Sequence, residues 1–160
     1  MLIRPATALD EGDIWSILEP VIREGEFFAY PRDLALSKLP GLWHGPGREV
    51  FVAEIDGQIV GTFYIKANQA GGGAHVANGG YATARESREK GVAREMCLYS
   101  LELAKQRGFK AMQFNFVVSS NERAVSLWQS LGFNIVGTLP NAFERPNGTE
   151  VDVFVMHRCL

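Results

Sequence analysis

The chain has 160 residues, a formal net charge of −2 at pH 7 and a pI near 5.9. Its length suits one ordinary domain, and its 46% apolar and 21% charged residues are typical of a soluble globular protein. The small net charge gives no overall basic footprint for nucleic acid or for an anionic membrane. The two cysteines, Cys97 and Cys159, lie far apart and lack metal-ligand spacing, which indicates free thiols in a reducing compartment.

The sequence predicts no targeting or membrane-spanning segment. Residues 1–5 contain no apolar stretch of a secretory signal, and no apolar run approaches the roughly 20 residues needed to cross a bilayer. His44, His75 and His157 are scattered, so we expect no metal site. The sequence therefore predicts a single domain over residues 1–160, located in the cytoplasm, with neither a nucleic acid nor a membrane as a partner.

The first third of the chain predicts a short strand and two helices. Residues 2–6 favour the strand. Asp10 is a possible N-cap for a helix whose apolar positions recur at helical spacing, namely Ile14, Ile17, Leu18, Val21 and Ile22. Pro20 lies inside this stripe and is expected to kink or end the helix. An aromatic turn at residues 24–31 precedes a second short helix expected over residues 33–39.

The middle of the chain predicts an antiparallel meander. The three expected strands cover residues 49–55, 58–67 and 75–83. Asp56-Gly57 is a hairpin dipeptide, and the glycines at 71–73 form the next turn. Gly79-Gly80 interrupts the third strand and suggests a bulge.

The second half predicts two helices and three more strands. The helix over residues 91–107 ends at Gly108, and the strand over 111–118 alternates apolar residues up to Phe116 and Val118. Ser119 and Glu122 resemble a capping box that opens the second helix. Its expected buried side is formed by Ala124, Leu127, Trp128 and Leu131. Strands at 134–139 and 151–157 complete the order β-α-α-β-β-β-α-β-α-β-β, a mixed α+β sheet.

The segment from Arg88 to Ala93, which reads REKGVA, lies between a predicted strand and the clearest predicted helix. The first N–H groups of a helix are unpaired and carry partial positive charge, so this position suits a phosphate or pyrophosphate. Gly91 lets the backbone approach an anion without a Cβ in the way. Arg85, Arg88, Lys90 and Arg94 concentrate bases where helices usually favour acids. The segment matches neither a Rossmann fingerprint nor a Walker A loop.

This segment resembles the Gln/Arg-x-x-Gly-x-Gly/Ala signature of the GCN5-related N-acetyltransferases. A second stretch is similar to another signature of that family: it begins at Asn121, continues with Ala124 and ends as LWQSLGF at Phe133. The two stretches are separated by a helix and a strand, as in the family. The resemblance implies the family fold, in which two central strands run parallel and then splay, here residues 75–83 and 111–118.

The resemblance also implies an acetyl-CoA site. The pantetheine arm is expected to pair with the strand backbone at Tyr81, Ala82 and Thr83. The remaining residues expected to bind acetyl-CoA are Arg88, Glu89, Lys90, Gly91, Val92, Ala93, Arg94, Asn121, Ala124 and Trp128. In many family members a tyrosine at the position of Trp128 protonates the leaving thiolate. An indole N–H is not a useful acid, so a bound water, Ser119 or Ser126 would replace it, or the thiolate would leave as a stabilised anion.

Asn78 and Asn115 lie on the two strands that are expected to splay. Together with Trp128 they resemble the azetidine-2-carboxylate, or proline-analogue, N-acetyltransferase branch of the family. That resemblance implies that Asn78 holds the carboxylate or amine of the acceptor, and that Asn115 orients the nucleophile or the thioester. The aromatic turn is expected to wall the acceptor pocket through Glu24, Phe28 and Tyr30.

The leading hypothesis is therefore an enzyme that transfers an acetyl group from acetyl-CoA to the amine of a small molecule by direct attack in a ternary complex, with an amino-acid or imino-acid analogue as the candidate acceptor. A homodimer is expected because dimers are common in the family. Two alternatives stay open. One is a non-catalytic acyl-CoA-binding or sensor module, which the missing tyrosine favours. The other is a protein N-acetyltransferase, against which the aromatic turn argues.

Overall fold

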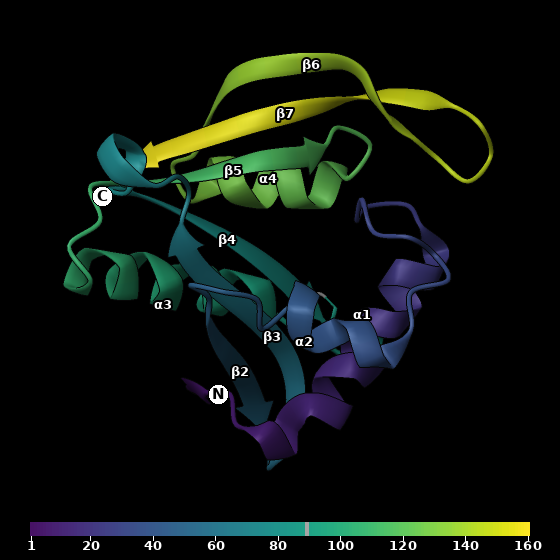
Figure 1. The fold of residues 1–160 in the computed structure, drawn as a ribbon, viewed down its shortest axis with the longest axis vertical. Helices are drawn as coiled ribbons and strands as arrows, with labels where there is room; N and C mark the ends of the chain where they lie inside the picture. The colour runs from purple at the N-terminus through teal and green to yellow at the C-terminus, as the bar shows by residue number, and fades with distance from the viewer. Residues whose placement is uncertain (89) are drawn as a thin grey trace.

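A seven-stranded mixed sheet forms the centre of the computed structural model, which describes residues 1–88 and 90–160. The strand order is β1-β2-β3-β4-β5-β7-β6. The bounds of the strands are β1 Leu2–Pro5, β2 Glu49–Ile55, β3 Gln58–Ala67, β4 Val76–Thr83, β5 Ala111–Val118, β6 Asn134–Glu144 and β7 Glu150–Cys159. Within this sheet β4 and β5 are parallel neighbours, and the other neighbouring strands are antiparallel. The predicted α+β mixed sheet is thus confirmed (Figure 1).

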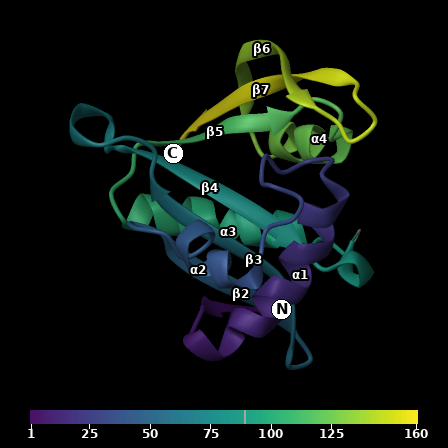
Figure 2. The ribbon, with the colours of Figure 1, turned by 45° about the vertical axis from the view of Figure 1, so that its right-hand side comes forward.

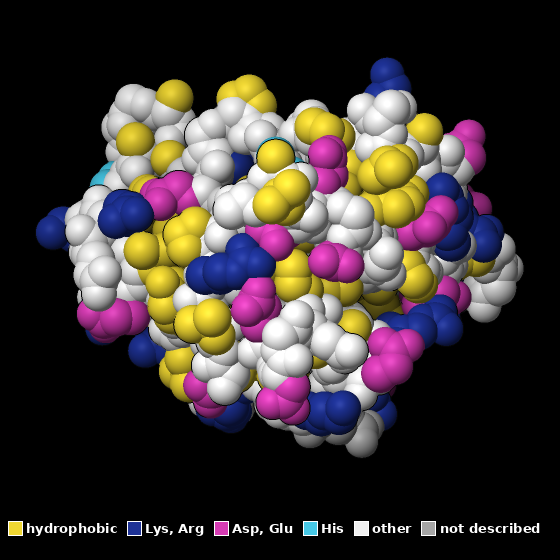
Figure 3. Space-filling view, turned by 90° about the horizontal axis from the view of Figure 1, so that it is seen from below, with side chains coloured by type: hydrophobic (Ala, Val, Ile, Leu, Met, Phe, Trp, Pro, Cys, Tyr) yellow, Lys and Arg dark blue, Asp and Glu magenta, His cyan; other side chains and the backbone are white. Residues whose placement is uncertain are grey.

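Helices cover both faces of the sheet (Figure 2). Buried residues of α1 (Glu11–Glu24) and of the short α2 (Leu39–Leu42) form one apolar cluster with β2 and β3. Buried residues of α3 (Val92–Gln106) and α4 (Glu122–Ser130) form a second cluster on the opposite face. Acidic and basic side chains are interspersed on the face seen in Figure 3, in keeping with the small net charge.

Helix α1 continues through Pro20, so of the two expected outcomes, a kink or an end, the end at this residue is wrong. Proline removes one helical hydrogen bond, but the residues on both sides of it are buried against the sheet. Burial of four aliphatic side chains at about 1.5–3 kcal/mol each outweighs that loss; these are Ile17, Leu18, Val21 and Ile22. The helix ends at Gly25, whose φ of 69° is left-handed and whose N–H donates to the carbonyl of Val21.

The Gly79-Gly80 pair does not form the expected bulge, because β3 and β4 pair without a register shift. The glycines instead leave room for side chains. A Cβ on Gly80 would lie 2.7 Å from Cε1 of Tyr64, and one on Gly79 would lie 3.2 Å from the hydroxyl of Tyr81. The pair therefore lets two tyrosines pack closely on opposite faces of β4.

An irregularity occurs in β5 instead. Its pairing with β7 gains one extra residue between Phe114 and Val117. The expected alternation is therefore wrong after Phe114, since Phe116 is 42% exposed and Val117 is buried. Asn115 lies within this bulge, which turns its side chain outward from the sheet core.

The parallel strands β4 and β5 separate soon after they begin. Their pairing is confined to Val76 with Ala111 and Ala77 with Met112, among the residues that the structure describes. Beyond Ala77 the edge of β4 has no strand partner on that side, and Figures 1 and 2 show the two strands diverging. This divergence opens the sheet at its centre.

An ion pair fixes the start of α1 to β1. Both carboxylate oxygens of Asp10 accept hydrogen bonds from the guanidinium of Arg4, at 2.7 and 2.8 Å, and the N–H of Thr7 donates at 2.7 Å. The Arg4 guanidinium holds the pKa of the Asp10 carboxyl well below its usual range, although burial opposes the shift. Because this pKa is depressed in the folded state, the stabilisation is present above the unfolded pKa of about 3.9 and is lost as the pH falls toward the folded value.

Asp10→Asn is accordingly expected to lower the free energy of unfolding by about 1–3 kcal/mol at pH 7. The gap between variant and parent should shrink as the pH falls below about 4, because the Asp10 carboxyl of the unfolded parent then takes up a proton while that of the folded parent stays ionised. Urea unfolding of both proteins at pH 7 and at pH 3 measures this. A gap that is equal at both pH values would contradict the account.

Candidate functional site

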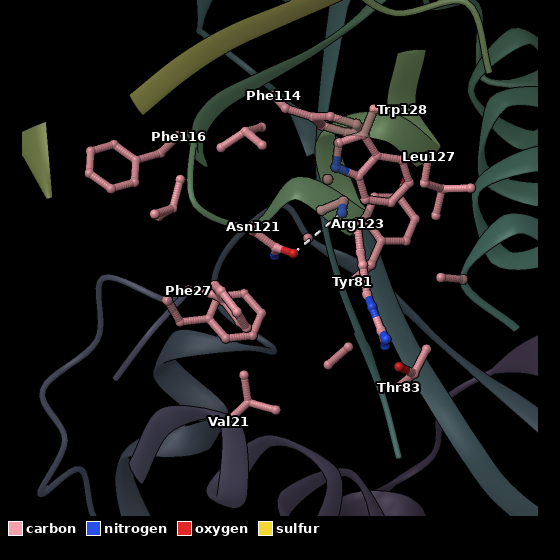
Figure 4. A pocket seen from close by; sticks show the side chains of 18 of the residues that line it. Val21, Phe27, Tyr81, Thr83, Phe114, Phe116, Asn121, Arg123, Leu127 and Trp128 are labelled. Carbon is pink, nitrogen blue, oxygen red and sulfur yellow. Dashed lines mark hydrogen bonds between the residues drawn. The ribbon is translucent and has the colours of Figure 1, made fainter. Parts of the chain in front are cut away.

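A cavity of about 1150 Å³ opens where β4 and β5 separate. Its walls come from β4, β5, the first turn of α3, the length of α4 and the aromatic loop after α1. Figure 4 shows Phe27, Asn121 and Trp128 facing this space from three separate parts of the chain. The cavity therefore joins the two sequence motifs, which are more than 25 positions apart in the chain, in one place.

The wall formed by β4 offers free backbone groups. The carbonyl of Val76 accepts from Asn68, and the N–H of Ala84 donates to Val60, so the even-numbered residues of β4 turn their backbone toward β3. Since backbone groups alternate along a strand, Gly79, Tyr81 and Thr83 turn theirs toward the gap left by β5. Tyr81, Ala82 and Thr83 all line the cavity. The alternation favours Tyr81 and Thr83 over Ala82 as backbone partners of a ligand.

The first turn of α3 forms the second wall. Gly91 precedes the helix with a left-handed φ of 77°, and among the described residues no side chain caps the helix N-terminus. The unpaired N–H groups of this turn remain available to an anion. The lining residues contributed by this region are Arg88, Gly91, Val92, Ala93 and Arg94. Lys90 is exposed and is not among them, and Glu89 lies outside the described residues.

Glu24 does not line the cavity, although the sequence suggested it as an acceptor contact. Its carboxylate pairs with Arg85, and its other oxygen lies 4.0 Å from a guanidinium nitrogen of Arg88. The end of α1 is thereby tied to the loop that leads into α3. Glu24 is placed to hold this loop rather than to touch an acceptor.

Asn121 is the N-cap of α4, and its Oδ1 accepts a hydrogen bond of 3.3 Å from the N–H of Ala124. The expected capping box at Ser119 is therefore wrong. The N–H of Ser119 donates to the carbonyl of Asp152 on β7 at 2.9 Å, which ties this turn residue to the end of the sheet instead of the start of α4. Asn121 and Ala124 both line the cavity.

Trp128 belongs to an aromatic cluster beneath the cavity. Its ring centroid lies 5.1 Å from that of Tyr81 and 5.0 Å from that of Phe114, and the residue is 8% exposed. The Tyr81 hydroxyl lies 2.6 Å from Oγ of Ser100, and burial raises the pKa of Tyr81 well above its usual value. The Tyr81 hydroxyl is therefore engaged with α3, and its raised pKa makes it a weaker acid than an ordinary tyrosine.

The two predicted asparagines lie on either side of the split. Asn78 is buried, and its Nδ2 donates to the carbonyl of Gln113 at 2.9 Å, which bridges β4 and β5 where their regular pairing ends. Asn115 is exposed; its Nδ2 donates to Oδ1 of Asn68 at 2.6 Å, and its Oδ1 accepts from Nε2 of Gln113 at 2.8 Å. Both asparagines line the cavity.

The end of the cavity next to α1 is aromatic. Phe28 and Tyr30, both predicted, line it and stack at 5.6 Å between ring centroids. Phe27 and Tyr64 also line it but were not predicted as site residues. Tyr64 lies in the middle of a regular strand, so only the neighbouring Gly79-Gly80 pair gave a signal of a large side chain there.

Among the described residues, no group of three His, Cys, Asp or Glu side chains is placed to hold a metal ion. No helix within the described part of the chain is long and apolar enough to cross a membrane.

The model of the acetyltransferase (GNAT) family matches residues 13–133. The chain is 34% identical over 99 residues to N-acetyltransferase aca1 of Schizosaccharomyces pombe, a match that covers 61% of this chain and 47% of that protein. The matched part is thus about half the length of this curated relative.

Among solved structures, a GCN5-related N-acetyltransferase from Kribbella flavida superposes with a TM-score of 0.93 at 37% identity, covering 99% of this chain and 97% of that one. The acetyltransferase yncA of Salmonella typhimurium, solved with acetyl-CoA, superposes with a TM-score of 0.88 at 20% identity, covering 100% and 94% of the two chains. This second likeness shows the fold alone.

Proposed function

Because the chain belongs to the acetyltransferase (GNAT) family, whose enzymes are acetyl-CoA-dependent N-acetyltransferases, we propose that it transfers an acetyl group from acetyl-CoA to the amine of a small molecule. The observation that carries this proposal is that one cavity adjoins both the free edge of β4 and the N-terminus of α3, which no described side chain caps. Acetyl-CoA is long and carries a peptide-like arm and a pyrophosphate. The free edge of β4 suits the peptide-like arm, and the N-terminus of α3 suits the pyrophosphate.

The donor would lie along β4 and reach the start of α3. Backbone groups of Tyr81 and Thr83 would pair with the amides of the pantetheine arm as an added strand would. The N–H groups of Val92 to Arg94, with the Arg88 and Arg94 side chains, would hold the pyrophosphate. Asn121 caps α4 on the opposite side of the arm. The fit follows from the free edge of β4 and the absence of a side-chain cap at Gly91.

Acetyl-CoA supplies a thioester whose carbonyl carbon the acceptor nitrogen attacks, and the carbon–sulfur bond then breaks. The chain would contribute orientation. Asn115 lies at the mouth of the split, with its amide fixed between Asn68 and Gln113, so it would orient the thioester or the attacking amine. Asn78 lies deeper and fixes the width of the split. With Trp128 in the tyrosine position, the thiolate would leave as an anion or take a proton from water.

The acceptor end favours a small molecule over a polypeptide. The aromatic loop after α1 is bridged to the β6–β7 hairpin by Nε of Arg145 and Oε2 of Glu26 at 2.8 Å. On the same side Phe116 of β5 packs against Phe143 of β6, with ring centroids 6.3 Å apart. The Arg145–Glu26 pair therefore joins the loop after α1 to the β6–β7 side across the acceptor end, and the Phe116–Phe143 contact packs β5 against β6 within that side. The asparagines and Trp128 further support an amino-acid or imino-acid analogue, as in the azetidine-2-carboxylate branch.

The direct test is release of free CoA from acetyl-CoA in the presence of a panel of amino acids, imino acids and simple amines. Amine-dependent release, with the acetylated product identified by mass, is the expected result. A protein that binds acetyl-CoA and turns over none of the amines would instead be an acyl-CoA-binding module.

Asn115→Ala is expected to lower kcat/KM for the acceptor by about 10- to 100-fold, because the loss of one oriented amide near the reacting atoms costs up to a few kcal/mol. The dissociation constant for acetyl-CoA should stay within about twofold of the parent. Asn134→Ala is the matched control, since Asn134 is exposed on β6 away from this cavity. An equal loss of kcat/KM in both variants, or an unchanged kcat/KM in Asn115→Ala, would show that Asn115 does not belong to the site.

A further inference from the structure

A second feature next to the acceptor end is a guanidinium without a counter-charge. The Cζ atom of Arg48 lies 4.2 Å from the centroid of the Tyr64 ring. Among the described residues no carboxylate lies within ion-pair distance of Arg48. Its Nη1 is buried and has no hydrogen-bond acceptor in the described part of the chain. The site around Arg48 is therefore electrostatically incomplete.

Other arginines near the cavity differ from Arg48. Arg85 pairs with Glu24, and Arg145 pairs with Glu26. The carboxylates at the start of the aromatic loop are thus already matched with cations. A buried N–H of a charged group that lacks an acceptor costs about 1–3 kcal/mol or more. Arg48 carries this cost, and its uncompensated positive charge attracts an anion bound nearby.

Tyr64 and Tyr30 connect Arg48 to the cavity. Both tyrosines line the cavity, whereas Arg48 stacks on Tyr64 from outside the lining. Neither phenol hydroxyl forms a hydrogen bond with another described residue. Burial raises the pKa of Tyr30, with Arg48 near enough to oppose that shift, so its hydroxyl stays protonated and can donate.

The neighbouring polar groups are already engaged. The indole N–H of Trp43, whose ring packs edge-on against Tyr64 at 5.1 Å, donates to Oγ1 of Thr62 at 3.0 Å. Thr62 in turn donates to the carbonyl of Phe51 at 2.9 Å. Of the polar side chains around Tyr64 described above, the two phenols and the guanidinium therefore have bonding capacity left.

We propose that Arg48, Tyr64 and Tyr30 form a subsite for a carboxylate of the acceptor. This inference rests on the proposed function and deepens it, because it selects amines that also carry an acid, such as amino acids and imino acids, over simple amines. The two phenols donate to the carboxylate, and the Arg48 guanidinium behind Tyr64 supplies the positive charge. The amine of the acceptor then points toward Asn78 and the split between β4 and β5.

The test uses matched pairs of compounds that differ by the carboxylate: proline with pyrrolidine, alanine with ethylamine, and phenylalanine with phenethylamine. Binding to the protein saturated with CoA is measured by calorimetry, and acetylation is measured with acetyl-CoA. At least one acid-bearing member should bind more tightly than its partner by at least about 10-fold, the value of one charge-assisted hydrogen bond. Arg48→Gln should remove this difference by raising KM with little change in kcat, and Arg48→Lys should restore part of it.

Arg107→Gln is the matched control, because this arginine pairs with Glu49 on the surface away from the cavity and should leave the preference unchanged. Thermal unfolding without ligands distinguishes a structural role. Arg48→Met should keep or raise the melting temperature, since it removes an unpaired buried N–H. A melting temperature lowered by several degrees, with the preference for acids intact, would overturn the proposal.

The absence of any acid-bearing compound that binds more tightly than its amine would overturn it as well. Different results would refute the proposed function itself. They are a protein that binds neither CoA nor acetyl-CoA, or one that transfers acetyl to no amine, with or without a carboxylate. Acetylation of simple amines at the rate of the acids would leave the proposed function in place and refute the carboxylate subsite.

Discussion

Gly91→Glu is expected to weaken acetyl-CoA binding by at least about 100-fold, because two effects act at the same atoms. A side chain at a φ of 77° costs roughly 1–2 kcal/mol of backbone strain, and the first turn of α3 shifts to relieve it. The added carboxylate also places a negative charge where the pyrophosphate would lie. Calorimetric titration with acetyl-CoA measures the change.

Gly108→Glu is the control for this variant. Gly108 follows the other end of α3 with a φ of 85°, and a Cβ at either glycine would meet open space. The two variants therefore carry similar strain, and thermal unfolding should show similar losses of stability. Only Gly91→Glu should lose acetyl-CoA affinity. Equal affinity in both variants would contradict the placement of the pyrophosphate.

Trp128→Ala is expected to lower the free energy of unfolding by about 3–5 kcal/mol, the usual cost of removing a buried aromatic side chain. The ring touches Tyr81 and Phe114, so its loss also removes the floor of the cavity. Turnover should fall in parallel. Urea unfolding and acetyl transfer, measured on the same preparations, test both effects.

Trp128→Phe and Trp128→Tyr separate packing from proton transfer. Both keep an aromatic ring and should lose less than about half of the stability that alanine loses. Phenylalanine should keep turnover within a few-fold of the parent, because the indole N–H is not needed as an acid, while tyrosine adds the phenol that many family members use. A loss of turnover beyond about 100-fold in a well-folded Trp128→Phe would show that the indole N–H takes part in the chemistry.

The donor site was predictable because it depends on local features of the sequence. Each donor motif is a short continuous stretch of sequence: one contains Gly91 and the bases around it, and the other begins at Asn121. Helix and strand periodicity then places the two stretches on neighbouring elements. The structure brings most of the residues expected to bind acetyl-CoA to one cavity. Glu24 does not line the cavity, although it was predicted at the acceptor end, because a carboxylate at the end of a helix gives no local sign of which arginine it will pair with.

The acceptor end was less predictable because it depends on contacts between distant segments. Tyr64 lies inside a regular strand, and Arg48 precedes β2 without a motif, yet tertiary packing places them together. The bulge was assigned to Gly79-Gly80, since glycine pairs often mark bulges, but these glycines make room for tyrosines. The extra residue falls instead in β5, beside Asn115, where the residues carry no bulge signal.

Amide hydrogen exchange with and without acetyl-CoA tests the central claim most directly, because it reports on the backbone groups that the donor would use. The account predicts that acetyl-CoA slows exchange at Tyr81 and Thr83 on β4 and at Val92 to Arg94 on α3, and leaves Ala82 unchanged because its backbone faces β3. Unchanged exchange at these amides in a protein saturated with acetyl-CoA would contradict it.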